Sequence, residues 1–419
     1  MRFSFLWIGI LCVHTLYGAV NPLKEARKNI KTARYEENGN EANKVRERLD
    51  NTEKTLIEAL NGEKSPKTRA EIYRMAAMVQ RKFNDIENEK IYLKRAYDTV
   101  LYYNSIYKLY RYMEQCDSTE VVSIPKSKKF RALARKELLV HRVNLLNGGR
   151  FYLKKKNYAE ALRFLDLYLS SAEYPMFEKD FLNQNDTLYS RVAYWAVTSA
   201  YYSGNYREVI RYAPVSFRFR KNEKYIQEYL CRSYQALNDS ARWISALKTG
   251  LLNFPDHSCF FTNLIAVLNN QGRYDEALEY ADRMIRYDSK SEQFWLARTV
   301  TLMQKDDLEE CISSSDVILA ANPMNADANL YKGLSYCKLA KRFSDRMEKE
   351  RFGSSPYKAC KQKMTACYEK AREPMENVRK LYPQDSARWA PLLYQIYLHL
   401  NHGAGFAEME SIMKKLPLK

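Results

Sequence analysis

The chain has 419 residues, of which 46% are hydrophobic and 28% are charged, and its formal net charge at pH 7 is +18. These proportions are typical of a globular protein and exclude a disordered or collagen-like chain. Glycine (13) and proline (12) are scarce while tyrosine (33) is abundant. The composition therefore favours helices joined by short turns and excludes an all-β fold.

Residues 1–19 are predicted to be a secretory signal peptide outside the fold. Arg2 precedes the apolar run Phe3–Val13, and the small residues Gly18 and Ala19 follow it. The run is short for a bilayer span, and retention as an uncleaved anchor is the alternative. No later segment has a run of apolar residues long enough to cross a membrane. We therefore expect an exported protein of a Gram-negative bacterium, with no transmembrane segment in the mature chain, located in the periplasm, at the cell surface or outside the cell.

Residues 20–120 have helical periodicity but no clean repeat. Apolar residues form two stripes at helical spacing. The first consists of Ile72, Met75, Ala76 and Val79, and the second of Ile91, Ala96, Val100 and Tyr103. Such stripes are typical of helix pairs that have lost their register, so we interpret this part as divergent helical repeats. Residues 121–139, which are polar and basic around Pro125, are predicted to form a connecting helix or linker.

Residues 140–419 contain a repeat with a period of 34 residues. Small or apolar residues recur at this spacing at Val209, Trp243, Ala277 and Cys311. Turn-forming residues recur five residues earlier, at Gly204, Asn238, Gly272 and Asp306. Each unit therefore predicts two antiparallel helices joined by a tight turn. Because one such pair cannot bury its own apolar face, the pairs must stack.

Two insertions interrupt this array. The first, near residues 176–187, is predicted to be an exposed loop. The second, near residues 341–361, is rich in basic residues, and we expect it to form lengthened helices that meet at the turn Gly353–Pro356. Helices over residues 386–400 and 406–415 are predicted to be a C-terminal capping pair.

The repeat resembles the tetratricopeptide repeat (TPR) family, whose helix-turn-helix unit has the same length, a small residue in its second helix and a proline at its end. The segments Gly272–Tyr280 and Asn157–Leu162 match the family's turn and second helix most closely. Trp295, Gly149 and Gly333 stand at positions of its first helix. The resemblance implies an all-α fold, a right-handed superhelical solenoid of antiparallel helix pairs.

The resemblance also implies a partner-binding groove, because first-helix side chains of the family line the concave face of the superhelix. The corresponding tyrosine, amide, hydroxyl and basic residues of this chain are Arg150, Lys154, Tyr194, Thr198, Tyr201, Tyr202, Tyr225, Arg232, Gln235, Asn269 and Asn270. Aromatic rings beside planar polar groups suit a protein or peptide partner. A glycan or acidic polymer of the cell envelope is the alternative ligand. The same tyrosines would serve equally well as packing between helices.

No catalytic, cofactor or metal motif is found. GxSxG, HExxH, GxGxxG and the P-loop are all absent, and the histidines after residue 19 are scattered. We expect a non-catalytic scaffold or adaptor without cofactor or metal; a polysaccharide-active alternative would need paired carboxylates in a cleft. The positive charge is spread over many repeats among 50 acidic residues. Solvated helix faces therefore explain it better than a nucleic-acid interface.

Four Asp-Ser or Asp-Thr pairs in predicted turns resemble the acceptor sequence for periplasmic O-glycosylation in one group of Gram-negative bacteria. Their hydroxyl residues are Ser118, Thr187, Ser240 and Ser386. The alternative is that the preceding aspartates are ordinary helix N-caps. In a eukaryotic secretory pathway, Asn185 and Asn238 would instead be N-glycosylation acceptors.

Seven cysteines follow Cys12, and an exported protein can form disulfides. Cys231 and Cys311 fall at interior positions of predicted helices, so we expect them to be small buried residues. Cys337, Cys360 and Cys367 are closer together, and one disulfide among them across the second insertion is possible.

Overall fold

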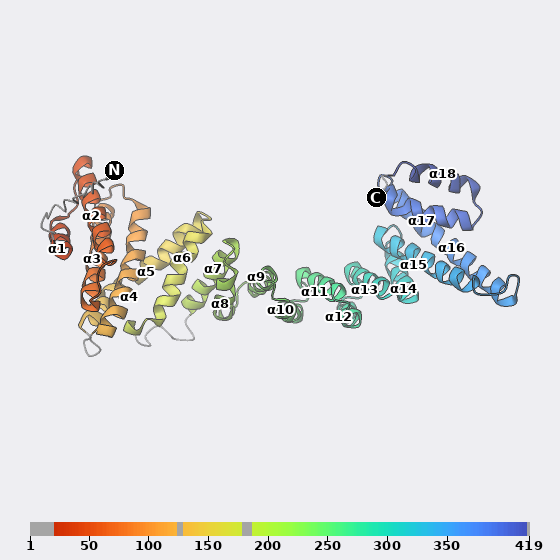
Figure 1. The fold of residues 1–419 in the computed structure, drawn as a ribbon, viewed down its shortest axis with the longest axis horizontal. Coiled ribbons are helices and arrows are strands. Elements are labelled where there is room, and N and C mark those ends of the chain that lie inside the picture. Colours follow the sequence, from red (N-terminus) through yellow and green to blue (C-terminus); the bar gives the residue numbers. More distant parts are fainter. Residues whose placement is uncertain (1–20, 124–128, 178–186, 417–419) are drawn as a thin grey trace, which may run out of the picture. The chain divides into compact units, whose positions relative to one another are not determined.

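The computed structural model describes residues 21–123, 129–177 and 187–416. Within these ranges the chain is all-α, with eighteen α-helices and three short 3-10 helices (Figure 1). The helices form two compact units, residues 1–233 and 234–419. The predicted signal peptide, residues 1–19, lies outside the described residues. No helix in the described ranges has the length and apolar character needed to cross a membrane.

The helices of the first unit are α1 (Pro22–Thr32), α2 (Gly39–Ala59), α3 (Pro66–Tyr92), α4 (Thr99–Ser123), α5 (Lys129–Lys154), α6 (Tyr158–Ser170), α7 (Thr187–Tyr202), α8 (Tyr206–Ser216) and most of α9 (Glu223–Ala236), with 3-10 helices η1 (Ser171–Glu173), η2 (Pro175–Phe177) and η3 (Phe217–Phe219). In this unit α2 to α5 have 21 to 27 residues, whereas α1 and α6 to α9 have 11 to 16. The boundary between the units falls inside α9.

The second unit consists of short helices of similar length followed by a long pair and a final short pair. They are α10 (Ser240–Asn253), α11 (Ser258–Asn270), α12 (Tyr274–Tyr287), α13 (Glu292–Lys305), α14 (Leu308–Ala321), α15 (Ala326–Met347), α16 (Ser355–Leu381), α17 (Ser386–His399) and α18 (Gly403–Met413). Alternate helices also touch, since α11 packs on α13 and α13 packs on α15. This is the stacking expected when each helix pair buries its apolar face against the next.

Seven turns between consecutive helices share one hydrogen-bonding pattern, the Schellman motif. Gly272 donates its N–H to the Asn269 carbonyl oxygen at 3.0 Å, and Arg273 donates to the Leu268 carbonyl oxygen at 2.9 Å. The residue in the position of Gly272 has a left-handed backbone in every such turn of the described ranges: Lys94, Lys156, Gly204, Asn238, Gly272, Asp306 and Asn401. The four turn residues predicted from the period are all in this set, so the predicted turn positions are confirmed.

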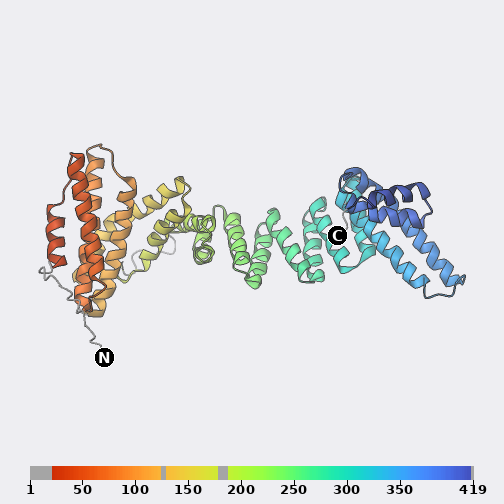
Figure 2. The same cartoon turned by 45° about the horizontal axis from the view of Figure 1, so that its top comes forward.

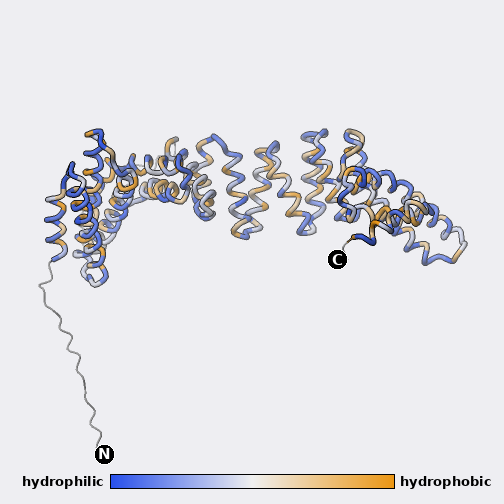
Figure 3. Tube along the Cα trace, turned by 90° about the horizontal axis from the view of Figure 1, so that it is seen from above, coloured by the Kyte–Doolittle hydropathy of each residue, from blue (hydrophilic) through white to orange (hydrophobic). Residues whose placement is uncertain are grey.

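The core follows the predicted period. Val209, Ala277 and Cys311 are completely buried, whereas Trp243 at the equivalent position is partly exposed and the next residue, Ile244, is buried. Glycines on first helices allow close packing, because a Cβ atom on Gly149 would lie 2.6 Å from the Leu165 side chain. Figure 3 shows hydrophobic and hydrophilic residues alternating along individual helices, which is the pattern of helices buried on one face. The predicted all-α architecture of consecutively packed helix pairs is confirmed (Figure 2).

Some local predictions were wrong. The second N-terminal stripe is not one helix face, because α3 ends at Tyr92, α4 begins at Thr99, and Ile91 and Val100 are exposed. Met176, placed in an exposed loop, is buried in η2, whereas residues 178–186 lie outside the described ranges. Ser118 was placed in a turn but belongs to α4.

The structure confirms the predicted burial of two cysteines but not the disulfide considered among three others. Cys231 and Cys311 are buried inside α9 and α14, as predicted. Cys337, Cys360 and Cys367 have free thiols, so the disulfide considered possible among them is not formed.

Candidate partner-binding surface

Five tyrosines from four successive helices of the first unit lie together. We call this group the tyrosine surface: Tyr158 of α6, Tyr201 and Tyr202 of α7, Tyr206 of α8 and Tyr229 of α9. The rings of Tyr201 and Tyr229 stack with centroids 4.3 Å apart. Tyr202 stacks on Tyr158 at 4.9 Å and meets Tyr229 edge-on at 5.9 Å. Offset and edge-on contacts of this kind stabilise one another and fix the ring positions.

Helical spacing explains why these side chains share a surface. Tyr194, Thr198 and Tyr201 are separated by four and three residues, so they lie on one face of α7. Tyr225, Tyr229 and Arg232 have the same spacing on α9. The two faces meet where Tyr201 stacks on Tyr229.

The rings of the tyrosine surface differ in how much of each is exposed to solvent. Tyr202 is 54% exposed, whereas Tyr201 and Tyr229 are only partly exposed. Burial raises the pKa of both Tyr201 and Tyr229 above the ordinary value of 10.0. Their phenols therefore stay neutral at physiological pH, where they donate and accept hydrogen bonds without acting as bases.

Polar and basic side chains lie on α5 and on the helices and turns that carry the rings. Asn222 donates from Nδ2 to the Tyr194 hydroxyl at 3.2 Å. The guanidinium of Arg150 lies 5.9 Å from the ring of Trp195, and Lys154 is exposed at the end of α5. Arg232 is exposed and forms an ion pair with Glu228 at 2.8 Å. The surface thus combines the exposed ring of Tyr202 with the Arg232–Glu228 ion pair beside Tyr201.

The predicted groove residues divide between the two units. Eight belong to α5, α7 and α9 of the first unit: Arg150, Lys154, Tyr194, Thr198, Tyr201, Tyr202, Tyr225 and Arg232. Gln235 and Asn270 belong to the second unit and are exposed. The assignment of Asn269 to an open groove was wrong. Asn269 is only 7% exposed and donates from Nδ2 to Thr301 Oγ1 at 3.0 Å, because its side chain points into the packing of α11 against α13.

Three members of the tyrosine surface were missed from sequence. Tyr158 and Tyr206 each occupy the first position of a second helix, directly after Asn157 and Asn205. The repeated Asn-Tyr pair is a signal for these two positions, which lie outside the first-helix positions that the resemblance assigns to the groove. Tyr229 is on α9 between two residues that were predicted, so the face of that helix would have identified it.

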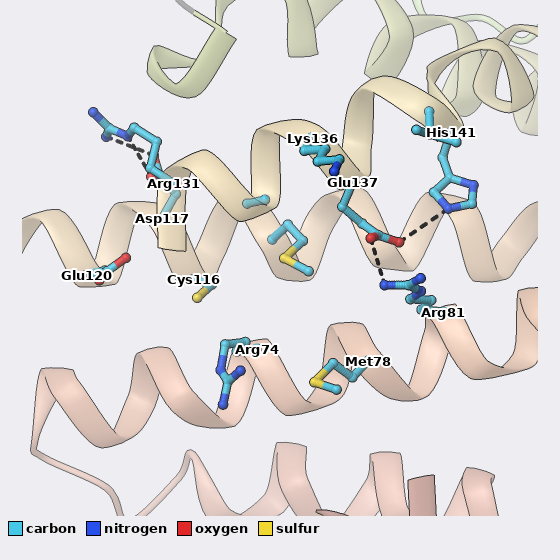
Figure 4. Close-up of a pocket in the computed structure, with 13 residues that line it drawn as sticks. Arg74, Met78, Arg81, Cys116, Asp117, Glu120, Arg131, Lys136, Glu137 and His141 are labelled. Atoms are coloured by element: carbon cyan, nitrogen blue, oxygen red, sulfur yellow. Dashed lines mark hydrogen bonds and ion pairs between the residues drawn. The ribbon is translucent and has the colours of Figure 1, made fainter. Parts of the chain in front are cut away.

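A second candidate site is a cavity of about 510 Å³ between α3, α4 and α5 (Figure 4). Its apolar lining includes Met78, Met113 and Ala134. Its charged lining includes Asp117, whose two Oδ atoms accept from Arg131 at 2.8 and 2.9 Å. These residues lie in the N-terminal part without a clean repeat, and no sequence pattern indicated the cavity.

Glu137, another charged residue of this cavity, is also paired with neighbouring side chains. Glu137 accepts from Arg81 at 2.8 Å and faces His141 Nε2 at 3.4 Å (Figure 4). The hydrogen bond with His141 is the main cause that lowers the pKa of Glu137. Burial raises the pKa of Cys116 to about 12, so this thiol is protonated and a poor nucleophile. In this cavity Asp117 and Glu137 are thus paired and the Cys116 thiol is protonated, beside an apolar lining.

In the described part of the chain, no three or more His, Cys, Asp or Glu side chains are grouped so that they could hold a metal ion. Two C-terminal histidines have packing roles instead. His399 stacks on Tyr368 with ring centroids 4.5 Å apart, and His402 caps α18 by accepting the Gly405 N–H at 3.0 Å.

The possible glycosylation residues lie in different settings. Ser240 and Ser386 are the first residues of α10 and α17. Asp239 accepts the Arg242 N–H at 3.1 Å, which is the N-cap alternative, whereas Asp385 makes no such bond. Thr187 begins α7. Ser118 is exposed on α4, and its hydroxyl donates to the Gln115 carbonyl oxygen at 3.1 Å.

No family model and no curated protein matches this sequence. Solved structures similar to it include the C-terminal part of a TPR repeat-containing protein from Cytophaga hutchinsonii (14% identity, 60% of this chain and 93% of that chain, TM-score 0.35). A TPR repeats protein from Bacteroides fragilis is 15% identical over 61% of this chain and 98% of that chain, with a TM-score of 0.33.

YrrB, described as a TPR protein with an unusual peptide-binding site, is 15% identical over 66% of this chain and 100% of that chain, with a TM-score of 0.25. These values describe a likeness of helix pairs at low identity. The repeat architecture of this chain itself rests on its period, its seven equivalent turns and its consecutive helix packing.

Proposed function

We propose that the protein is an exported, non-catalytic scaffold that binds an extended segment of a protein partner on the tyrosine surface. The observation that supports this most directly is the group of five tyrosine rings from four successive helices, with Tyr202 more than half exposed. Tyrosine and arginine dominate the energetics of protein interfaces because they combine large contact area with polar tips.

The chemistry around the rings favours a particular kind of segment. Ring contacts hold Tyr201 and Tyr229 in place, so little side-chain entropy is lost when a ligand packs on them. Arg232 lies near the phenol of Tyr201 and pairs with Glu228, and Arg150 and Lys154 add positive charge on α5 of the same unit. An extended peptide with an apolar or aromatic residue flanked by acidic residues fits this combination.

The test uses residues 20–419, which retain every described helix, to select linear peptides from a display library. Binding of a selected peptide should weaken about tenfold or more in Tyr202→Ala, as expected for a central aromatic contact. Tyr202→Phe should retain most of the affinity, because it keeps the ring. Tyr287→Ala in α12 is the matched control, since Tyr287 is 55% exposed and far along the chain from the tyrosine surface.

The outcomes separate the alternatives. Selected peptides that bind Tyr202→Ala as tightly as the parent would contradict this location. A parallel glycan array distinguishes the second ligand class: glycan binding that is lost in Tyr202→Ala, with no peptide selected, would replace the peptide by a glycan on the same surface. Loss of binding in Tyr287→Ala alone would place the site in the second unit.

Export is supported by the arrangement of Arg2, the apolar run Phe3–Val13 and the small residues Gly18 and Ala19. If this part of the proposal is correct, the native protein begins at Val20 and is recovered outside the cytoplasm. N-terminal mass analysis of protein from fractionated cells tests it. A mature protein that still begins with Met1 would contradict cleavage, and a cytoplasmic fraction would contradict export.

A further inference from the structure

The long helix pair α15–α16 contains a segment without a buried side chain. Helices α10 to α14 have 13 or 14 residues, whereas α15 has 22 and α16 has 27. Every residue from 341 to 363 is at least partly exposed, although Ala340 and Met364 on either side are buried. We call residues 341–363 the distal hairpin; its end extends past α17 and α18 in Figures 1 and 2.

The distal hairpin is strongly basic. It contains eight Lys or Arg residues and three acidic residues. Lys341 pairs with Asp345 within α15, and Arg342 pairs with Asp306 at its base. The exposed Lys349, Arg351 and Lys358 lie beside the turn between the helices, where they outnumber the exposed Glu348 and Glu350 and leave residues 348–358 with a net charge of +1. An anionic surface is the electrostatic complement of this end.

The tip also presents an aromatic residue to solvent. Phe352 is 85% exposed, and its ring meets that of Tyr357 at a centroid distance of 5.1 Å. Gly353 beside it has a left-handed backbone, so the chain reverses sharply and Phe352 lies at the end of the pair. Transfer of an exposed phenyl ring from water into an apolar medium lowers the free energy.

The positive charge and the exposed Phe352 ring together indicate the kind of partner. A soluble polyanion would neutralise the lysines and arginines but leave Phe352 in water. A projecting tip has no concave surface that could enclose a peptide. A bilayer that contains anionic lipid provides negative headgroups for the cations and an apolar layer just beneath them for the ring.

We propose that the distal hairpin docks on the surface of a bilayer containing anionic lipid, with Phe352 inserted below the headgroups and Lys349, Arg351 and Lys358 at the headgroup level. This contact is peripheral and does not involve the tyrosine surface. It is therefore independent of the proposed partner segment, and either proposal can fail alone.

The experiment measures co-sedimentation of residues 20–419 with vesicles of phosphatidylcholine alone or mixed with phosphatidylglycerol. This form lacks the apolar run Phe3–Val13, which would bind lipid by itself, and keeps every described helix. We expect binding to the mixed vesicles only, and its loss when salt is raised from about 0.05 M to about 0.5 M. Phe352→Ser should weaken binding about tenfold.

Charge reversal at the tip has a matched control in the same unit. The triple variant Lys349→Glu, Arg351→Glu and Lys358→Glu should abolish binding. The variant Arg283→Glu, Arg286→Glu and Lys290→Glu makes the same change in net charge on exposed residues at α12 and should bind normally. Leu252→Ser, at an exposed apolar residue of α10, is the control for Phe352→Ser.

Four results would overturn the proposal. They are no binding to the mixed vesicles, equal losses in the two triple variants, unchanged binding in Phe352→Ser, and binding of soluble polyglutamate as tight as that of vesicles. Because all variants alter exposed residues, circular dichroism should show unchanged helix content, which separates loss of docking from loss of folding.

Discussion

Lys156 illustrates how the repeat tolerates residues that are poorly suited to its turns. Its φ is +55°, a left-handed conformation that costs an ordinary L residue about 1 kcal/mol relative to glycine. Its side chain is exposed, so replacement removes no packing. Lys156→Gly should therefore raise the free energy of unfolding by about 0.5–1 kcal/mol, measured by urea denaturation.

The opposite substitution at an equivalent turn should have the opposite sign. Gly272 has φ of +70°, and no atom lies within 4 Å of the position that a Cβ atom would take, so Gly272→Ala should lower the free energy of unfolding by about 1 kcal/mol through backbone strain alone. Gly403→Ala is the control, because Gly403 has the same open surroundings without the left-handed backbone. Equal effects of the two alanine substitutions would contradict the argument.

At the scale of single elements, Glu71 joins α1 to α3. Its Oε1 accepts from Arg27 at 2.7 Å and from Arg74 at 2.6 Å. The hydrogen bond from Arg74 is the largest cause that lowers the pKa of Glu71 below its ordinary 4.5. A carboxylate with a lowered pKa in the folded state adds stability above its ordinary pKa, and this stability is lost as the pH falls through the folded pKa.

Glu71→Gln should therefore cost about 0.5–1 kcal/mol at neutral pH, a modest value because the three side chains are partly solvated. The difference from the parent should shrink as the pH falls below 4.5. Denaturant unfolding at several pH values measures it. Glu41→Gln, which removes an exposed pair with Lys44 inside α2, should change little. A Glu71→Gln effect that stays constant with pH would argue against the ion pairs as its source.

Helix α16 should differ in stability along its length. Residues 355–363 have no buried side chain, whereas Met364, Tyr368, Ala371 and Met375 are buried in the C-terminal core. Amide protection follows burial and local packing. Hydrogen exchange read by mass spectrometry should be on the order of tenfold faster or more in residues 343–362 than in residues 364–378. Uniform protection along α16 would show that contacts with residues outside the distal hairpin stabilise it.

The sequence pattern predicted the turns and helices that are determined by residues close together in the sequence. Small residues and turn residues repeat together, so the turns at Asn238 and Asp306 and the helices around them could be placed from the period. The turn at Lys94 could not, because a lysine there gives no turn signal although its φ is +54°. For the same reason the stripe that includes Ile91 and Val100 looks continuous in the sequence.

The candidate site was predictable only in part. Helical spacing places Tyr194 and Tyr201 on one face of α7, and this needs no tertiary information. The stacking of Tyr201 on Tyr229 and of Tyr202 on Tyr158 depends on how neighbouring helices pack, which a register does not specify. The burial of Asn269 against Thr301 has the same origin.

At the scale of the whole molecule, the period continues from Gly204 to Asn238, yet the boundary between the compact units falls between Ser233 and Tyr234. A sequence period predicts the structure of each helix pair. It does not predict how much the interface between neighbouring pairs contributes to stability. In repeat proteins stability is approximately a sum of unit and interface contributions, so a weakly coupled boundary allows parts to unfold separately.

Two unfolding transitions are therefore expected, one for each unit. Leu145 in α5 belongs to the first unit's core and Leu393 in α17 to the second unit's C-terminal core, and both are completely buried. Leu145→Ala and Leu393→Ala should each destabilise their own core by about 2–5 kcal/mol. Followed by circular dichroism during denaturant unfolding, each variant should shift one transition and leave the other in place. A single transition that both variants shift equally would mean that coupling across α9 exceeds the difference between the units, and the chain would then unfold as one cooperative array despite its two cores.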